Sequence, residues 1–166
     1  MVTVEGLKQI REVLRGIEEK IQEICSQVPE YEFLLSIPGF GPDVSSKVLG
    51  AIGDPFRFQN GKQVLKMAGL DLNAERSGKT SANAIPVISK KGKADLRYAL
   101  YQAAMIASIK NNAFIVYYTD KLRGREREPG IKTKMRVKLA AKLLLIAWAL
   151  MKKKEPFHPG YLAVAS

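Results

Sequence analysis

Two glycines and two prolines lie together in segment 37–42, IPGFGP, between two apolar stretches that both have helical spacing. Proline suits the first position of a helix, so a new helix is predicted to begin near Pro42. Gly39 and Gly41 lack a Cβ atom, so the backbone there can take positive φ and lie directly against a ligand. Free N–H groups and a positive dipole at the helix start favour an anion such as phosphate. The segment therefore predicts a helix-hairpin-helix motif that binds a nucleic-acid backbone without reading bases; a plain turn between two helices is the alternative.

The positive charge of the chain lies in its second half. The 166 residues carry a formal net charge of +11. Residues 1–36 hold 4 Lys and Arg against 7 Asp and Glu, residues 37–75 hold 4 against 4, and residues 76–166 hold 19 against 5. This asymmetry indicates a polyanionic partner. Nucleic acid is favoured over a membrane because no segment combines a large apolar face with a basic face and interfacial aromatic residues. A basic surface that is simply solvated is the alternative.

The first 28 residues have the heptad pattern of a coiled coil. Apolar residues alternate spacings of three and four, and polar residues fill the other positions. Pro29 then disfavours helical backbone at the residue before it. We expect a dimerising or domain-bridging coiled coil, and keep open a long amphipathic helix that folds back on its own domain. The expected dimerisation seam consists of Leu7, Ile10, Leu14, Ile17, Ile21 and Ile24, with Val28 at its end.

The remaining segments with helical spacing predict an all-α fold. Short helices are expected at 32–36, 42–52 and 62–69, and longer ones after Ala94 and over 131–154. The stretch 70–97 is polar, basic and rich in small residues, which is typical of a long functional loop with room for a short hairpin. We divide the chain into a coiled-coil helix at 1–28, a domain that contains the hairpin at 29–158, and a tail at 159–166.

Composition excludes several classes of protein. No apolar run approaches the roughly 20 residues that a membrane span needs, and the first residues lack the apolar core of a signal peptide. We therefore expect a cytoplasmic protein without a membrane partner. Cys25 is the only cysteine and His158 the only histidine, which excludes an intramolecular disulfide and a Cys/His zinc site. Metal could enter only through carboxylates.

Five ordered blocks of the sequence resemble a known family. They are IPGFGPDVSSKVLGAIGD, FRFQNGKQVLKMAGLDL, RSGK, ISKKGKADLRYALYQAA and VKLAAKLLLIAWALMKKKEPF. In this order and spacing they resemble the carboxy-terminal domain of the DEDD-type, RuvC-like insertion-sequence transposases and site-specific DNA invertases, some of which are RNA-guided recombinases. The resemblance covers about residues 31–158, and five blocks make it far more specific than the hairpin alone.

The resemblance implies that different domains of a longer protein supply different catalytic groups. In that family a RuvC-like domain supplies four metal-binding carboxylates, a coiled coil follows, and the carboxy-terminal domain supplies a serine that becomes covalently joined to DNA. The carboxylates of this chain show no paired spacing of a two-metal site, so we interpret the chain as a carboxy-terminal fragment. We expect no cofactor in this chain, and Mg²⁺ in the full-length transposase.

Two serines lie in matching blocks. Ser77, in Arg76-Ser77-Gly78-Lys79, lies at the Ser-Gly position of the family and has neighbouring cations that could neutralise charge developing on a phosphodiester. Ser89 is the alternative nucleophile, although it could equally be an N-cap-like residue before the next helix, and a structural role for both stays open. The expected DNA contacts are Gly39, Phe40, Gly41, Ser45, Lys47, Arg76, Lys79, Lys90, Lys91, Lys93 and Arg97.

Three functions therefore compete. The first is the DNA-binding and strand-transfer domain of a transposase. The second is a free-standing, non-catalytic helix-hairpin-helix protein that coats nucleic acid, and the third is a dimerisation module whose basic face serves another acidic partner. The expected partners are DNA, with a guide RNA as a further candidate, and a second copy of the chain bound through the coiled coil.

Overall fold

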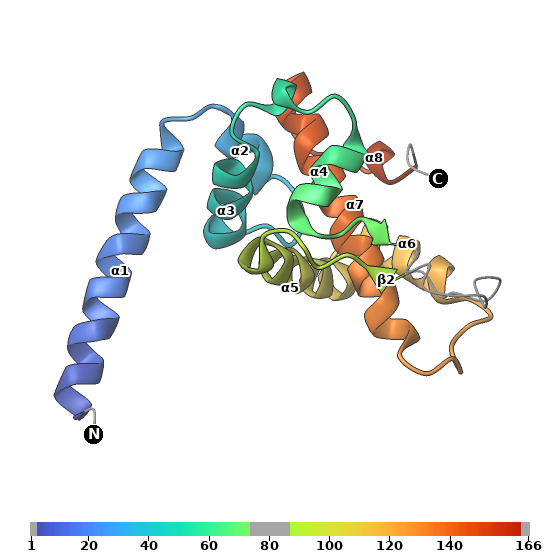
Figure 1. Ribbon diagram of the computed structural model, residues 1–166, viewed down its shortest axis with the longest axis horizontal. Coiled ribbons are helices and arrows are strands. Elements are labelled where there is room, and N and C mark those ends of the chain that lie inside the picture. The colour runs from blue at the N-terminus through green and yellow to red at the C-terminus, as the bar shows by residue number, and fades with distance from the viewer. Residues whose placement is uncertain (1–2, 74–86, 164–166) are drawn as a thin grey trace.

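The fold is helical, which confirms the predicted class (Figure 1). A computed structural model describes residues 3–73 and 87–163. A two-residue antiparallel ladder, β1–β2, pairs Leu72 with Ile88 and Asn73 with Val87. No helix in the described ranges is long and apolar enough to cross a membrane. The elements are α1 (Val4–Ser26), α2 (Glu30–Leu35), α3 (Pro42–Ile52), the 3₁₀ turn η1 (Pro55–Arg57), α4 (Gly61–Ala68), β1 (Leu72–Asn73), β2 (Val87–Ile88), α5 (Ala94–Lys110), α6 (Asn112–Leu122), α7 (Ile131–Lys153) and α8 (Gly160–Ala163).

Helices α5 and α7 form the centre of the domain, and the shorter helices pack around them (Figure 1). One face of α5 is lined by small buried residues, which allows neighbouring helices to approach its backbone closely. Large buried side chains of α7 fill the space opposite this face. The small residues of α5 are Ala99, Ala103, Ala104 and Ala107, and the apolar residues of α7 include Leu139, Leu143, Leu144, Ala147 and Leu150.

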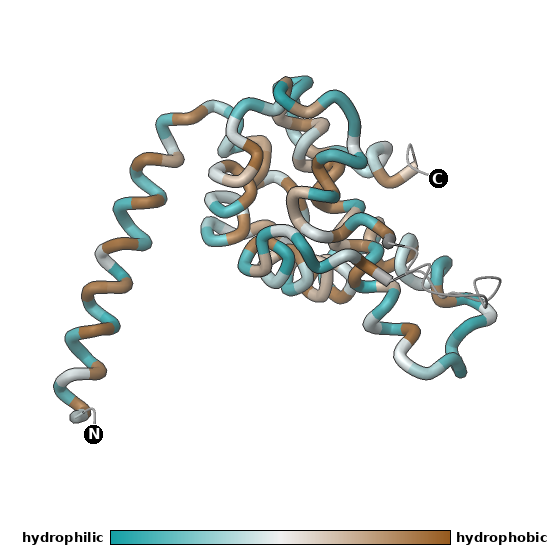
Figure 2. The backbone as a smooth tube through the Cα atoms, viewed as in Figure 1, coloured by the Kyte–Doolittle hydropathy of each residue, from teal (hydrophilic) through white to brown (hydrophobic). Residues whose placement is uncertain are grey.

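Helix α1 extends away from this domain (Figure 1). It begins at Thr3, whose hydroxyl accepts a hydrogen bond from the Gly6 N–H at 3.2 Å, and no residue along it is buried. Figure 2 shows apolar segments recurring along its whole length. The six seam residues from Leu7 to Ile24 are between 42% and 55% exposed. The alternative in which this helix folds back along its own domain is therefore wrong, and its apolar stripe faces solvent.

The turn between α2 and α3 packs against the middle of α5. Gly39 has a φ of +90°, which side-chain-bearing residues rarely adopt. A Cβ atom at this position would lie 2.4 Å from the Ala103 carbonyl oxygen and 3.3 Å from the Ala107 Cβ atom. Gly39 thus lets the turn approach α5 of its own chain, which is a packing reason for glycine rather than the ligand contact that we expected.

The segment that we expected to be a tail, 159–166, contains the short helix α8. Its residues Tyr161 and Leu162 are buried and belong to the hydrophobic core. The aromatic rings of Phe157 and Phe114 stack just before it, with centroids 5.5 Å apart. The described part of this segment, up to Ala163, is therefore part of the folded domain.

The packing of the turn predicts opposite effects for two glycine substitutions. Gly39→Ala should lower the free energy of unfolding by about 2–4 kcal/mol, because the added methyl group adds left-handed strain and overpacks against α5. Gly50→Ala is the matched control: Gly50 lies within α3 with no atom near its Cβ position, so alanine should stabilise by about 0.5–1 kcal/mol. Urea unfolding followed by circular dichroism measures both, and equal stabilities of the two variants would contradict the close approach.

Candidate nucleic-acid interface

The amino end of α3 is open to an anion. Gly41 is the N-cap residue and provides no side-chain cap, and Pro42 occupies the first turn. The Ser45 N–H donates to the Gly41 carbonyl at 2.9 Å, whereas the N–H groups of Asp43 and Val44 have no acceptor in the described part of the chain. No atom of the described residues lies within 4 Å of the position that a Cβ atom on residue 41 would occupy. These unpaired donors at the positive end of a helix can bind a phosphate group.

Of the other hairpin residues that we expected to contact DNA, Phe40 and Ser45 lie inside the protein and Gly39 is partly buried. Phe40 is buried, and its N–H donates to the Ile37 carbonyl at 2.9 Å. Ser45 is fully buried, and its Oγ atom has no hydrogen-bond partner among the described residues. Gly39 faces α5, as described above. The structure therefore gives Phe40, Ser45 and Gly39 packing positions that support the turn, and leaves Gly41 as the hairpin glycine with open space beside it.

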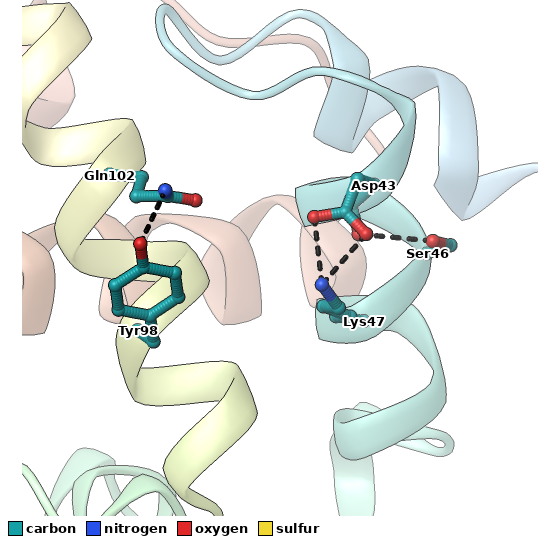
Figure 3. A network of polar contacts seen from close by, with 5 residues as sticks. All are labelled: Asp43, Ser46, Lys47, Tyr98 and Gln102. Atoms are coloured by element: carbon teal, nitrogen blue, oxygen red, sulfur yellow. Dashed lines mark hydrogen bonds and ion pairs between the residues drawn. The ribbon is translucent and has the colours of Figure 1, made fainter. Parts of the chain in front are cut away.

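Lys47 lies one turn into α3 and is held by an ion pair (Figure 3). Its Nζ atom is 2.7 Å and 2.8 Å from the two carboxylate oxygens of Asp43. The Ser46 Oγ atom donates to the Asp43 carbonyl at 3.0 Å. The ion pair offsets the negative charge that Asp43 would otherwise place beside an approaching phosphate.

The neighbouring helix α5 presents two further polar groups near α3 (Figure 3). Tyr98 is 64% exposed, and its hydroxyl accepts a hydrogen bond from Gln102 Nε2 at 3.0 Å. Our sequence reasoning missed both residues. Their spacing of four residues on the exposed side of a helix was the available signal, but the sequence alone does not show that this side lies next to α3.

A second group of predicted DNA contacts lies between β2 and α5. Lys90, Lys91 and Lys93 are exposed. The backbone that carries them is fixed to the carboxyl end of α4, because Lys90 N–H donates to the Gly69 carbonyl at 3.1 Å and Lys93 N–H donates to the Met67 carbonyl at 3.0 Å. Their side chains are thus presented to solvent from an anchored backbone.

Arg97 is engaged by the protein itself. Its Nη1 atom donates to the Ala68 carbonyl at 3.1 Å, where it satisfies one of the free carbonyl groups at the end of α4. Gly92 crosses the same helix end, since a Cβ atom there would lie 2.2 Å from the Gly69 nitrogen. Arg97 and Gly92 therefore help to join the start of α5 to the end of α4.

Ser89 forms two hydrogen bonds with Asp71. Its N–H donates to the Asp71 carbonyl at 2.9 Å, and its hydroxyl donates to the Asp71 carboxylate. The N-cap of α5 is Lys93, so the expectation that Ser89 acts as an N-cap-like residue is wrong. The two hydrogen bonds extend the β1–β2 ladder by one residue pair.

The other predicted residues of the basic loop, Arg76, Ser77 and Lys79, lie outside the described residues. The predicted DNA contacts that the structure does describe form two groups, one at the start of α3 and one between β2 and α5. Helix α5 contacts both α3 and α4, and so connects these two parts.

Burial and a neighbouring positive charge both lower the pKa of one lysine of α7. Lys142 is buried, and desolvation lowers the pKa of its ammonium group, with the positive charge of Lys121 lowering this pKa further. Lys121 belongs to α6. Two lysine ammonium groups, one from α6 and one from α7, therefore lie close enough to repel each other, and neither residue belongs to the set of DNA contacts predicted from the sequence.

No cluster of three or more potential metal ligands occurs among the described residues. No three His, Cys, Asp or Glu side chains among residues 3–73 and 87–163 lie close enough together to hold an ion. Asp71, the carboxylate beside Ser89, is bonded to that serine. The Mg²⁺ ion of the full-length transposase stays an expectation of the resemblance.

Comparison with known proteins identifies the family. A sequence profile described as "Transposase IS116/IS110/IS902 family" matches residues 31–119, from α2 to α6. This match covers more than half of the chain and includes both described parts of the interface. The chain belongs to this transposase family.

Curated relatives agree with this assignment. The chain is 26% identical to a pilin gene-inverting protein of Moraxella bovis over 93% of its own length and 48% of the relative. It is 26% identical to a probable family 20 transposase of Pseudomonas aeruginosa over 94% of the chain and 47% of the relative. It is also 24% identical to the insertion element IS116 44.8 kDa protein of Streptomyces clavuligerus, over 93% and 37%. The chain spans about half the length, or less, of these relatives.

Proposed function

We propose that the chain is the DNA-binding and strand-transfer part of a transposase or recombinase. Two observations support this proposal. The family match contains the α2–α3 hairpin and the basic segment before α5, and one relative is named for the inversion of a gene, which is a rearrangement of DNA. Membership of the family makes DNA the natural partner for the cationic second half of the chain.

The single observation that carries the binding role is the open amino end of α3. Two unpaired N–H groups, a glycine with open space beside it and the positive end of the helix dipole occur together there. Such a site binds one phosphate and carries no sequence information. The hairpin would therefore hold the DNA backbone in the manner of a helix-hairpin-helix motif, whatever the bases are.

For strand transfer we propose Ser77 as the nucleophile. In this reaction the serine Oγ atom attacks the phosphorus of a phosphodiester, an Oγ–P bond forms, and the bond from phosphorus to one deoxyribose oxygen breaks. The serine proton is lost to a base, and the released oxygen takes up a proton to become a hydroxyl group. Attack by a hydroxyl group of another strand reverses the step and joins the DNA. Arg76 and Lys79 would stabilise the charge on phosphate.

The base and any metal for this reaction would come from another part of the full-length protein. The resemblance to DEDD-type transposases suggests a RuvC-like domain as their source. A composite site of this kind leaves the chain, by itself, as a DNA-binding module.

We further propose that α1 pairs with α1 of a second copy. Its apolar stripe is exposed along the whole helix, and such a stripe is stabilised by a partner with the same heptad spacing. Pairing would place two hairpins in one complex, which suits a reaction that joins two DNA strands.

Substitution at the hairpin tests DNA binding. Gly41→Val should reduce affinity for a mixed-sequence DNA duplex about tenfold, because its side chain blocks the approach of the backbone, a loss of about 1.4 kcal/mol. The fold should be retained, since Gly41 has extended backbone and open space beside it. Gly50→Val at the other end of α3 is the matched control. Equal affinities of the two variants in fluorescence anisotropy would show that the hairpin is only a turn.

Charges placed in the stripe of α1 test assembly. Ile17→Asp combined with Ile21→Asp should convert a dimer into a monomer, because pairing would bury two carboxylates in each helix. Arg15→Asp combined with Lys8→Asp, on the polar face, provides a matched control that should leave the dimer intact. Sedimentation equilibrium measures the mass of each, and a concentration-independent monomer for the unmodified chain would remove the pairing proposal.

The covalent step has its own test in the full-length protein. Ser77→Ala should abolish a covalent protein–DNA adduct and leave DNA affinity nearly unchanged, because one hydroxyl group adds little to an interface made of phosphate contacts. Mass spectrometry of the adduct locates the attachment. Attachment at Ser89 or Ser81 would overturn the assignment of Ser77, and Mg²⁺-dependent cleavage by the isolated chain would overturn the composite site.

A further inference from the structure

Helix α7 carries an unusual set of charges. Its 23 residues contain seven Lys or Arg and no Asp or Glu. Five of these cations lie in the first half of the helix, and three of the five are exposed. We call these three exposed residues, Lys132, Lys134 and Lys138, the basic end of α7.

No described carboxylate forms an ion pair with the basic end of α7. None of its three lysines forms an ion pair with a described residue. The nearby acids are already engaged: Asp120 pairs with Arg123 at 3.2 Å, and Glu128 accepts hydrogen bonds from Arg125 at 2.9 Å and 2.8 Å. The Arg125 hydrogen bond is also the largest cause that lowers the pKa of Glu128, with a smaller contribution from Lys134. The three ammonium groups are therefore available to an external anion.

The first of these lysines occupies a position that does not favour the helix. The amino end of a helix is the positive end of its dipole, so a cation in the first turn, such as Lys132, is unfavourable there, and the effect falls off beyond that turn. The N-cap residue Gly130 has a φ of +71° and no capping side chain, and the first turn contains no acid. Each of the helices α1 to α6 has a side-chain cap or an acid in its first turn. Local rules are usually broken where function requires it.

The first turn of α7 is nevertheless held in place by α6. The Tyr118 hydroxyl donates to the Lys132 carbonyl at 3.2 Å. The guanidinium of Arg136 lies 5.9 Å from the centroid of the same tyrosine ring. The Arg136 Nε atom is buried without a hydrogen-bond partner in the described residues. The lysines are thus presented from a fixed helix rather than from a loose loop.

We propose that the basic end of α7 is a second binding surface for the phosphate backbone of duplex DNA, separate from the α2–α3 hairpin. This inference rests on the proposed function and extends it to residues that the sequence analysis did not place in the DNA-binding site. Lys134 and Lys138 are one helical turn apart, about 6 Å along the axis, so both can reach phosphates of the same strand. Two separate contacts would fix the direction of the duplex across the domain, which one phosphate contact cannot do.

Other anionic partners fit this surface less well. Binding to an acidic membrane surface requires an apolar helix face that can enter the lipid. The apolar residues of α7, from Leu139 onward, are buried in the core or packed against it, so this helix does not offer such a face. The exposed part of the surface offers unpaired charges without an apolar anchor, which is typical of phosphate-backbone contacts.

The test compares two charge-matched triple variants of the whole chain. In the first, Lys132, Lys134 and Lys138 are replaced by Gln; in the second, Lys8, Arg15 and Lys20 of α1 are replaced by Gln, which removes the same net charge. Affinity for a short mixed-sequence DNA duplex is measured by fluorescence anisotropy over a series of salt concentrations, with an RNA duplex of the same length in parallel. Thermal unfolding of each variant is recorded.

We expect the α7 variant to lose at least tenfold in DNA affinity at low salt, and its slope of log K against log salt to become shallower by about 2 to 3, since each phosphate contact contributes about 0.9. The α1 variant should keep the slope of the unmodified chain. The α7 variant should unfold at the same temperature or a higher one, because unfavourable charges leave the amino end of the helix.

Equal slopes for the two variants would overturn the second surface while leaving the hairpin proposal standing. A loss confined to the RNA duplex would also overturn it. Failure of the unmodified chain to bind DNA at low salt would instead contradict the proposed function itself.

Discussion

Close packing against the alanine face of α5 is the constraint on which the rest of the domain depends. The small side chain of Ala103 leaves its carbonyl oxygen accessible to the turn at Gly39, and the glycine has no Cβ atom to prevent the contact. The same helix packs against α7 through the central core and begins beside the end of α4. Helix α5 therefore contacts both α3, with its open amino end, and α4, to which the segment of lysines before α5 is hydrogen-bonded.

Acidic and basic residues are distributed unevenly over the helices. Acidic residues are concentrated in α1, where they pair with lysines and arginines of the same helix, for example Lys20 with Glu23 at 2.7 Å. Six lysines of the second half instead form no ion pair with a described residue: Lys90, Lys91 and Lys93 before α5, and Lys132, Lys134 and Lys138 at the basic end of α7. This uneven distribution of charge accompanies membership of a transposase family.

The sequence predicted the elements better than their contacts. Helical periodicity and the signals at Pro42 and Gly69 located α3 and the end of α4, because caps and turns depend on neighbouring residues. It could not show that Gly39 would meet α5, that Ser89 would bond to Asp71, or that Tyr161 would be buried, because each contact joins distant segments. For the same reason Phe40 and Ser45 were expected at the DNA surface, whereas they lie in the core.

Hydrogen–deuterium exchange of the chain with and without a DNA duplex tests the central claim, that two separate surfaces of this domain hold the DNA backbone. Bound DNA slows amide exchange where it excludes water or accepts a hydrogen bond from the backbone. The account predicts protection of the unpaired amides at the start of α3, residues 43–44, and of the first turns of α7, residues 131–138, with no change along the exposed stripe of α1. Protection of only one of these segments, or protection confined to other parts of the chain, would contradict it.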